Sequence, residues 1–406
     1  MKKDILDIIN YAIKKANPYD ATFDALKRLE PVSGRLFVFS IGKAAASMAK
    51  AAADFYKDKI TYGLAVTKYG YAKDFSSPYF KVIEAAHPIG DENSIRAAEA
   101  ALDISDKTKK GDTCLVLLSG GGSALFEKSI VPPDVYKDIT KKLLSRGAPI
   151  KDINAIRCCF SLVKGGKLAE AMYPAKVVTV ALSDVLDNDI STIASGITVP
   201  NSNMPTFVEE AAARYLPEYR NLVVSLSKRR VEYLINDGGY YIIGDINLLC
   251  RAAEERAAAL GYSVTSLPRT FDDEARYQAM QICDMIPREK GKHAYIGGGE
   301  TTVVINGSGT GGRNQEMALG AALALRGKKG ILFASVDSDG TDGPTDAAGG
   351  MADGETFSRI KKGGVNPVFA LIDNDAYHAL KVSDDLIFTG PTGTNVNDLV
   401  VVLTDR

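Results

Sequence analysis

Short apolar runs alternate with helical patterns through the first 236 residues. The runs have the length and composition of buried strands, and the apolar residues between them recur at the spacing of amphipathic helices. Such alternation favours a mostly parallel sheet with helices on both faces. The predicted strands cover residues 36–41, 63–67, 81–85, 113–118 and 176–182.

The alternation breaks at the turn-forming residues Asn236-Asp-Gly-Gly239, where we place a domain boundary. Two runs beyond it, 294–297 and 301–305, lie too close together for a helical crossover, which predicts a hairpin in a mixed sheet. We therefore predict an α/β protein with a Rossmann-like, doubly wound parallel sheet in residues 1–236 and a mixed-sheet α/β domain in residues 237–406. A cleft between two such domains is the expected active site. The other strands predicted in the second half are 262–267, 331–335, 367–372 and 396–403.

Composition narrows the class of protein. The 406 residues are 46% apolar and 24% charged, with a formal net charge of −1, which argues against a nucleic-acid or anionic-membrane partner. The five cysteines lack CxxC spacing and fit buried free thiols in a reducing compartment. No apolar segment approaches the ~18 residues of a membrane span. We expect a cytoplasmic protein with a small-molecule substrate, and the oligomeric state stays open, a homo-oligomer included.

Gly-rich loops follow several predicted strands. In Ser40-Ile-Gly-Lys43 a strand turns into a helix whose predicted first residue is Lys43, where an ammonium opposes the helix dipole unless it reaches an anion. A second loop lets backbone N–H groups approach an anion closely. It lacks the Walker A and dinucleotide fingerprints and the Gly-x-Ser-x-Gly elbow of covalent hydrolases. This second loop consists of Ser119, Gly120, Gly121, Gly122 and Ser123.

Acidic residues follow two further strands. Asp184 and Asp189 come after the run at 176–182 and could bind a cation or accept a hydroxyl proton. A denser group follows the run at 331–335, and clustered carboxylates cost free energy unless a cation neutralises them. Its spacing does not match an EF-hand loop, so Mg²⁺ held by one or two carboxylates and phosphate oxygens fits better. The residues of this group are Asp337, Asp339, Asp342 and Asp346.

One further Gly-rich region runs from Gly298 to a helix predicted to start at Arg313. Arg313 could clamp a carboxylate or phosphate through two parallel hydrogen bonds, or it could be neutralised structurally by Glu300 or Glu316. Glycine anion loops, a lysine, an arginine and acidic metal candidates are together the parts of phosphoryl transfer, which needs positioning and charge neutralisation more than a covalent nucleophile.

These loops resemble those of the glycerate 2-kinase family, whose carboxyl-terminal half is known as the MOFRL domain. The matches span nearly the whole chain in the family's order. They are Ser40-Ile-Gly-Lys-Ala-Ala, Ala86-His-Pro-Ile-Gly-Asp91, Leu118-Ser-Gly-Gly-Gly-Ser-Ala-Leu125, Leu182-Ser-Asp-Val, Gly297-Gly-Gly-Glu-Thr-Thr302, Gly309-Thr-Gly-Gly-Arg-Asn-Gln-Glu316 and Asp339-Gly-Thr-Asp-Gly-Pro-Thr-Asp-Ala-Ala-Gly349.

The resemblance implies Mg²⁺-dependent transfer of the ATP γ-phosphoryl group to the C2 hydroxyl of D-glycerate, giving 2-phosphoglycerate and ADP. It also implies that Lys43 and Arg313 match the active-site lysine and arginine of the family. One stretch departs from the pattern, because Asn201 and Asn203 stand where acidic residues are expected. This departure puts those two positions in doubt as charged ligands and leaves the reaction class unchanged.

A mechanistic hypothesis gives each candidate a role. Arg313 holds the glycerate carboxylate, Lys43 neutralises the transferring phosphoryl group, and Asp184 or Asp189 orients Mg²⁺ or accepts the hydroxyl proton. The candidates for nucleotide binding are Ser119, Gly120, Gly121, Gly122, Ser123, Gly298 and Glu300. The candidates for metal binding are Asp184, Asp337, Asp339 and Asp342.

Two alternatives remain. A hydroxypyruvate reductase, a name that some relatives of the family carry, would need a nicotinamide site, and the Gly-x-Gly-x-x-Gly fingerprint of such sites is absent from the sequence. A non-catalytic phosphosugar-binding module would use the same anion loops without turnover.

Overall fold

The computed structural model describes residues 1–200, 205–231 and 237–405, which form two compact units. The N-terminal unit is Pro18–Ile243, and the C-terminal unit combines Met1–Asn17 with Gly244–Arg406. The predicted division at residues 236 and 237 therefore differs from the observed one, chiefly because helix α1 (Lys2–Lys15) belongs to the C-terminal unit. Its buried isoleucine stripe packs on α11 (Ile246–Ala259), an association that sequence order alone could not predict.

The N-terminal unit contains a six-stranded sheet in the order β3-β2-β1-β4-β5-β6. All the strand pairs from β3 to β5 are parallel, as predicted for a doubly wound sheet. The strand order reverses beside β1, so the carboxyl ends of β1 and β4 form the topological switch point where such sheets bind ligands. The strands are β1 (Leu36–Ile41), β2 (Ile60–Lys68), β3 (Phe80–Ala85), β4 (Thr113–Leu118), β5 (Lys176–Leu182) and β6 (Tyr240–Gly244).

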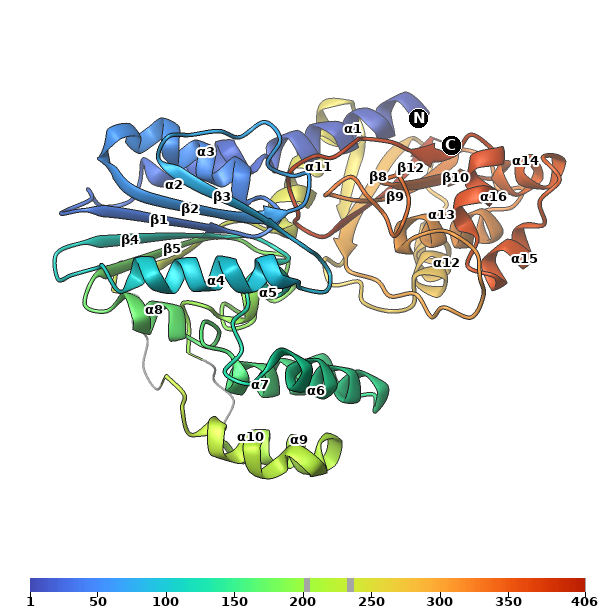
Figure 1. Ribbon diagram of the computed structural model, residues 1–406. Helices are drawn as coiled ribbons and strands as arrows, with labels where there is room; N and C mark the ends of the chain where they lie inside the picture. The colour runs from blue at the N-terminus through green and yellow to red at the C-terminus, as the bar shows by residue number, and fades with distance from the viewer. Residues whose placement is uncertain (201–204, 232–236, 406) are drawn as a thin grey trace. The chain divides into compact units, whose positions relative to one another are not determined.

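Helices cover both faces of this sheet. Figure 1 shows α2 and α3 on one face and α4 and α8 on the other. The core between the layers is built from strand residues that are fully buried, such as Phe39 and Val116. The helices are α2 (Pro18–Leu26), α3 (Ala45–Tyr56), α4 (Glu92–Ser105), the one-turn α5 (Gly122–Leu125) and α8 (Lys167–Met172), with the short 3₁₀ helices η1 (Lys57–Lys59) and η2 (Ile193–Ser195).

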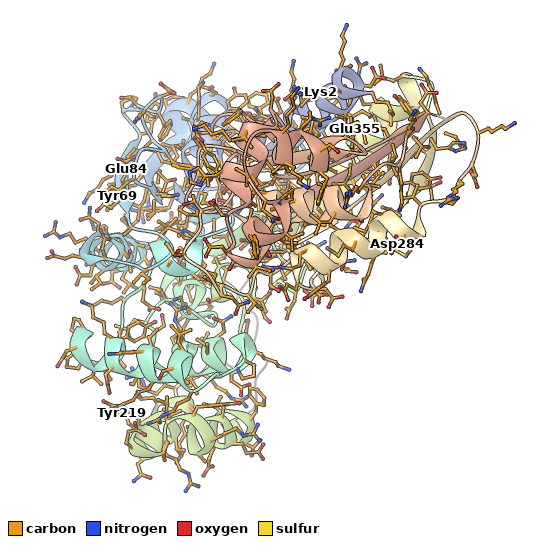
Figure 2. All side chains as sticks on the ribbon, turned by 90° about the vertical axis from the view of Figure 1, so that its right-hand side faces the viewer. Lys2, Tyr69, Glu84, Tyr219, Asp284 and Glu355 are labelled. Carbon is orange, nitrogen blue, oxygen red and sulfur yellow. The ribbon has the colours of Figure 1, made fainter. Side chains whose placement is uncertain are left out.

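A helical lobe extends from the same unit and has a hydrophobic cluster of its own, centred on Ile139, Ile156 and Phe160. Figure 2 labels Tyr219 in this lobe, and the Tyr219 hydroxyl donates a hydrogen bond to Asp138 at 2.7 Å. The lobe comprises α6 (Pro133–Ser145), α7 (Ile150–Phe160), α9 (Pro205–Tyr215), η3 (Pro217–Tyr219) and α10 (Arg220–Ser227).

The C-terminal unit has a second six-stranded sheet in the order β11-β10-β9-β12-β8-β7. Only β7 and β8 pair in parallel among these strands, so the sheet is mixed, as predicted. The strands are β7 (Ser263–Ser266), β8 (Lys292–Gly299), β9 (Ile331–Asp337), β10 (Gly349–Asp353), β11 (Leu386–Ile387) and β12 (Asp398–Asp405). Besides α1 and α11, its helices are α12 (Ala275–Met285), α13 (Arg313–Ala324), α14 (Thr356–Lys362), α15 (Pro367–Ile372) and α16 (Ala376–Val382).

Two predicted strands of this unit are wrong. Residues 301–305 form no strand and make only an isolated bridge between Thr302 and Glu274, so the mixed sheet arises without the predicted hairpin. Residues 367–372 form helix α15 instead of a strand, because the Asn366 side chain caps the N–H groups of Val368 and Phe369 and Pro367 occupies the first helical position. A short apolar run cannot by itself distinguish a strand from a buried helix.

The cysteines and the apolar character of the helices were also predicted from the sequence. All five cysteines are free, and four of them are buried, as predicted. Within the described ranges, no helix combines the length and the apolar character needed to cross a bilayer.

Candidate active site

The loops after β1 and β4 are joined to each other at the switch point of the N-terminal sheet. The Lys43 amide donates to the Gly120 carbonyl at 2.9 Å, and the Ala44 amide donates to the Ser119 hydroxyl at 3.1 Å. Gly42 has φ 130°, and a Cβ on it would lie 2.3 Å from the Ser119 carbonyl oxygen, so only glycine permits this approach. Helix α3 begins at Ala45 rather than at Lys43, which corrects the prediction and places Lys43 in the turn.

The glycine loop, residues 119–123, presents donors that the protein does not use. Within the described residues, the amide N–H groups of Gly120, Gly122 and Ser123 meet no protein acceptor. Gly121 has φ 83°, and a Cβ there would lie 3.2 Å from Cγ of Lys43 and 3.1 Å from Cδ2 of His87. Backbone donors beside a lysine form an anion-binding concavity. His87 lies against this loop, although the sequence analysis did not single it out; its place in the family motif at 86–91 was the available signal.

Asp184 follows β5 and lies against the same loop. Its carboxylate accepts a hydrogen bond from the Gly121 amide and feels the charge of Lys43, yet burial outweighs both and raises the pKa of Asp184 above its ordinary value. A raised pKa suits a carboxylate that accepts a proton near neutral pH. Asp189, by contrast, is exposed and accepts hydrogen bonds from the Ser191 amide and hydroxyl at 2.9 and 2.8 Å. Burial raises the pKa of Tyr240, and the charges of Asp184 and Asp189 raise it further.

Arg313 is the first residue of α13, as predicted, and it is surrounded by carboxylates. Its guanidinium binds Asp398 through two hydrogen bonds of 2.6 and 2.9 Å and also reaches Asp337 at 3.1 Å and Glu300 at 3.3 Å. We call these four residues the Arg313 cluster. The sequence left open that Glu300 or Glu316 neutralises Arg313. Glu300 does pair with Arg313, whereas Glu316 pairs with Arg276 instead.

Asp398 is the main partner of Arg313, and the sequence analysis did not identify it. The residue begins β12, whose antiparallel pairing with β9 aligns Asp398 with Asp337. Burial raises the pKa of Asp337 well above its ordinary value, and the charges of Asp398 and Asp339 raise it further. The cluster contains three carboxylates and one guanidinium, so it carries an excess of negative charge that a cation would relieve.

The four aspartates of the loop after β9 have different roles. Asp339 accepts hydrogen bonds from the amide and hydroxyl of Thr341, and the exposed Asp346 accepts one from Tyr377. Asp342 is buried and caps α13, because its two oxygens accept the amides of Asn314 at 3.1 Å and Gln315 at 2.8 Å. We therefore assign Asp342 to helix capping instead of metal binding.

Gly298 also has a structural role in place of the predicted ligand contact. It lies inside β8, where its amide donates to the Pro268 carbonyl at 3.1 Å, and a Cβ would lie 2.3 Å from the Asp398 carbonyl oxygen. Its N–H is therefore committed to the protein, unlike those of the glycine loop. The predicted positions Asn201 and Asn203 lie outside the described residues.

A metal ion would have to be held partly by its substrate. Among residues 1–200, 205–231 and 237–405, no group of three or more His, Cys, Asp or Glu side chains is arranged to hold a metal. Mg²⁺ ordinarily uses only one or two protein carboxylates and takes its other ligands from phosphate and water. The carboxylate oxygens of Asp337 and Asp339 fit this chemistry, because a cation would relieve the burial and repulsion that raise the pKa of Asp337.

The fold and the site together indicate a class of enzyme, the phosphotransferases. A doubly wound sheet with an anion loop and a lysine at its switch point suits phosphoryl transfer, which requires positioning and charge neutralisation. Two family models match the chain: residues 4–226 match DUF4147, described as a domain of unknown function, and residues 293–398 match the MOFRL family.

Individual relatives give the family a name. D-glycerate 2-kinase from Thermotoga maritima is 39% identical over 99% of this chain and 98% of its own. The crystal structure of a glycerate kinase from Thermotoga maritima superimposes with a TM-score of 0.92 at 40% identity, covering 99% of both chains. A protein from Agrobacterium vitis, named provisionally as a hydroxypyruvate reductase, is 36% identical over 91% of this chain and 99% of its own. The chain belongs to the glycerate kinase family and is a kinase.

Proposed function

We propose that this protein transfers the γ-phosphoryl group of ATP to the C2 hydroxyl of D-glycerate, producing 2-phosphoglycerate and ADP. The observation that carries the proposal is the glycine loop, whose N–H groups at Gly120, Gly122 and Ser123 meet no acceptor in the described chain and lie beside Lys43. The names of the relatives supply the substrate and the position of transfer.

The residues of the N-terminal unit are assigned to the phosphates and to the proton. The glycine loop binds nucleotide phosphates through its backbone donors, and Lys43 neutralises charge on the transferring phosphoryl group. Asp184 accepts the proton of the attacking hydroxyl, a role that its raised pKa supports. His87, which lies against Gly121, is a further candidate for contact with phosphate oxygens. Asp189 serves the turn with Ser191 and has a weaker case.

The residues of the C-terminal unit are assigned to the substrate carboxylate and the metal. Arg313 recognises the glycerate carboxylate with the part of its guanidinium that faces Glu300, where its hydrogen bond is the longest of the cluster at 3.3 Å. Asp337 and Asp339 would hold Mg²⁺, which supplies charge neutralisation to the phosphates when bound. The Asp398 carboxylate keeps the guanidinium in place through its two hydrogen bonds.

An activity assay separates the proposal from its main rival. The purified protein is supplied either with ATP, Mg²⁺ and D-glycerate or with NADH and hydroxypyruvate. We expect ADP formation that depends on glycerate and no oxidation of NADH. Oxidation of NADH without ADP formation would favour the reductase named for the Agrobacterium relative. Tight binding of phosphate esters without either turnover would favour a non-catalytic module.

A further inference from the structure

A buried charged network lies beneath the glycine loop and has no part in the proposed chemistry. The Lys164 side chain is fully buried and forms an ion pair with Glu127, which is 8% exposed. Glu127 also accepts hydrogen bonds from the hydroxyls of Ser161 at 2.6 Å and Tyr136 at 3.0 Å. Arg157 donates in turn to the Tyr136 oxygen at 2.9 Å. Two cations and one carboxylate therefore share a largely buried region, in which Lys164 is fully buried and Arg157 is half-buried.

Both cations of this network converge on one backbone atom of the glycine loop. The ammonium of Lys164 donates to the Ser123 carbonyl at 2.8 Å, and the guanidinium of Arg157 reaches the same oxygen at 3.4 Å. In a continuing helix this carbonyl would accept the amide of Glu127, but that amide donates to Ser94 instead. The two cations thus replace the missing helical partner of Ser123.

This replacement matters because α5 is only one turn long. Its internal hydrogen bonds are few: Ala124 and Leu125 donate to Gly121, and Phe126 donates to Gly122. A helix this short is not stable by itself, so its geometry depends on what holds its ends. Cations at the carboxyl end of a turn also favour the alignment of its peptide dipoles, whose positive ends point out at the amino end.

Stability alone is a poor explanation for the ion pair. Removing two charges from water is costly, and well-packed apolar residues of similar volume are often as stable as a buried pair or more stable. The charges of Lys164 and Arg157 and the hydrogen bonds from Lys164 and Ser161 overcome the effect of burial and hold the pKa of Glu127 below its ordinary value, so this carboxylate is ionised. The protein thus keeps charged side chains at a buried place, where removing them from water costs free energy.

We propose that Lys164, oriented by Glu127, is a positioning residue for nucleotide binding: by fixing the Ser123 carbonyl it holds α5 so that the N–H groups of Gly122 and Ser123 are directed at phosphate. This inference rests on the proposed role of the glycine loop and adds residues that touch neither substrate nor nucleotide. Arg157 assists through the same carbonyl, and Tyr136 links Arg157 to Glu127.

The decisive variant replaces both members of the pair, Glu127→Leu with Lys164→Met, which removes one charge of each sign and keeps Arg157 with its Tyr136 and Ser123 contacts. We expect its melting temperature to stay near that of the wild type while the KM for ATP rises about ten-fold, the factor that corresponds to 1.4 kcal/mol. The KM for glycerate should stay within about two-fold. A purely structural network would give the opposite pattern, with an altered melting temperature and an unchanged KM for ATP.

A milder variant covers the case in which the double substitution fails to fold. Tyr136→Phe keeps the ring and removes only the hydroxyl that joins Arg157 to Glu127. We expect a smaller rise in the KM for ATP, about two- to five-fold, because Lys164 remains in place. An unchanged KM for ATP in the folded double variant would overturn the inference. If the double variant does not fold, an unchanged KM for ATP in the folded Tyr136→Phe protein would overturn it.

The matched control uses an ion pair at the amino ends of β1 and β4, the strands whose carboxyl ends lead into Lys43 and the glycine loop. Arg35 and Asp112 precede β1 and β4 and pair at 2.6 Å, far along both strands from the glycine loop. Arg35→Met should lower the melting temperature and leave the KM for ATP unchanged. If the wild type itself neither binds ATP nor turns over, the proposed function fails. If the wild type is active and the network variants keep its KM, only the positioning role fails.

Discussion

The buried cap of α13 gives a prediction about stability and pH. Asp342 is 1% exposed, and burial, together with the charge of Asp398, raises its pKa from 3.8 to about 7. Between these two values the folded protein binds a proton that the unfolded chain has lost. The free energy of unfolding therefore falls as the pH rises through this interval, and the contribution is fully present only below the unfolded pKa.

The size of the effect follows from the pKa values. One pKa unit corresponds to about 1.4 kcal/mol, so the rise from 3.8 to about 7 amounts to roughly 4 kcal/mol between pH 4 and pH 7. Asp342→Asn removes the titration and keeps a side-chain oxygen that can cap the amides of Asn314 and Gln315. The free energy of unfolding of the variant minus that of the wild type should increase with pH, whatever fixed cost the amide brings.

Urea unfolding at several pH values from 5 to 8 measures this difference. We expect it to increase by about 2–3 kcal/mol over the range, since part of the titration lies below pH 5. Asp346→Asn is the control, because this carboxylate belongs to the same loop but is exposed. Parallel curves for the wild type and Asp342→Asn would refute the reasoning, as would a decrease in the difference with pH.

The other predictions concern turnover with ATP and D-glycerate. Lys43→Ala should lower kcat by about a hundred-fold or more, because it removes a charge fixed beside the glycine loop, whereas Lys50→Ala on the exposed side of α3 should not. Asp184→Asn should lower kcat by about 10²-fold or more, whereas Asp187→Asn, at an exposed carboxylate nearby, should not. The kcat of the wild type should fall on acidification, at a pH above the ordinary pKa range of aspartate, because the pKa of Asp184 is raised. Arg313→Lys should raise the KM for glycerate by about ten-fold, since an ammonium cannot hold Asp398 through two hydrogen bonds and also reach the glycerate carboxylate. Equal KM values would remove Arg313 from substrate binding.

Much of the fold followed from local pattern, and the wrong predictions have different causes. Strands β1, β4 and β5 are predominantly apolar runs in a parallel sheet buried on both faces, where sequence and burial coincide. The run at 367–372 is equally apolar but forms a helix, because the side-chain cap from Asn366 decides its state. The assignment of α1 to the C-terminal unit depended on packing against residues more than two hundred positions away, which no local pattern contains.

The site shows the same division between local and distant information. Arg313 and the glycine loop were predictable, because a strand, glycines and a helix start lie next to each other in the sequence. Asp398 and the Lys164–Glu127 pair were not. Asp398 reaches Arg313 only through the pairing of β12 with β9, and Lys164 reaches the glycine loop only through the interior of the unit. The loss of Asp342 as a metal candidate has a similar origin: a carboxylate in a glycine loop has the same local pattern whether it binds a cation or caps a helix.

The central claim is the identity of the reaction, and phosphorus NMR of a mixture of the wild-type protein, ATP, Mg²⁺ and D-glycerate tests it most directly. The account predicts that the ATP γ-phosphate signal is replaced by those of ADP and of a phosphomonoester whose phosphorus couples to the single proton on C2. A phosphomonoester coupled to the two protons on C3 would contradict the position of transfer. An ATP signal that stays unchanged in the presence of glycerate and folded protein would contradict the function itself.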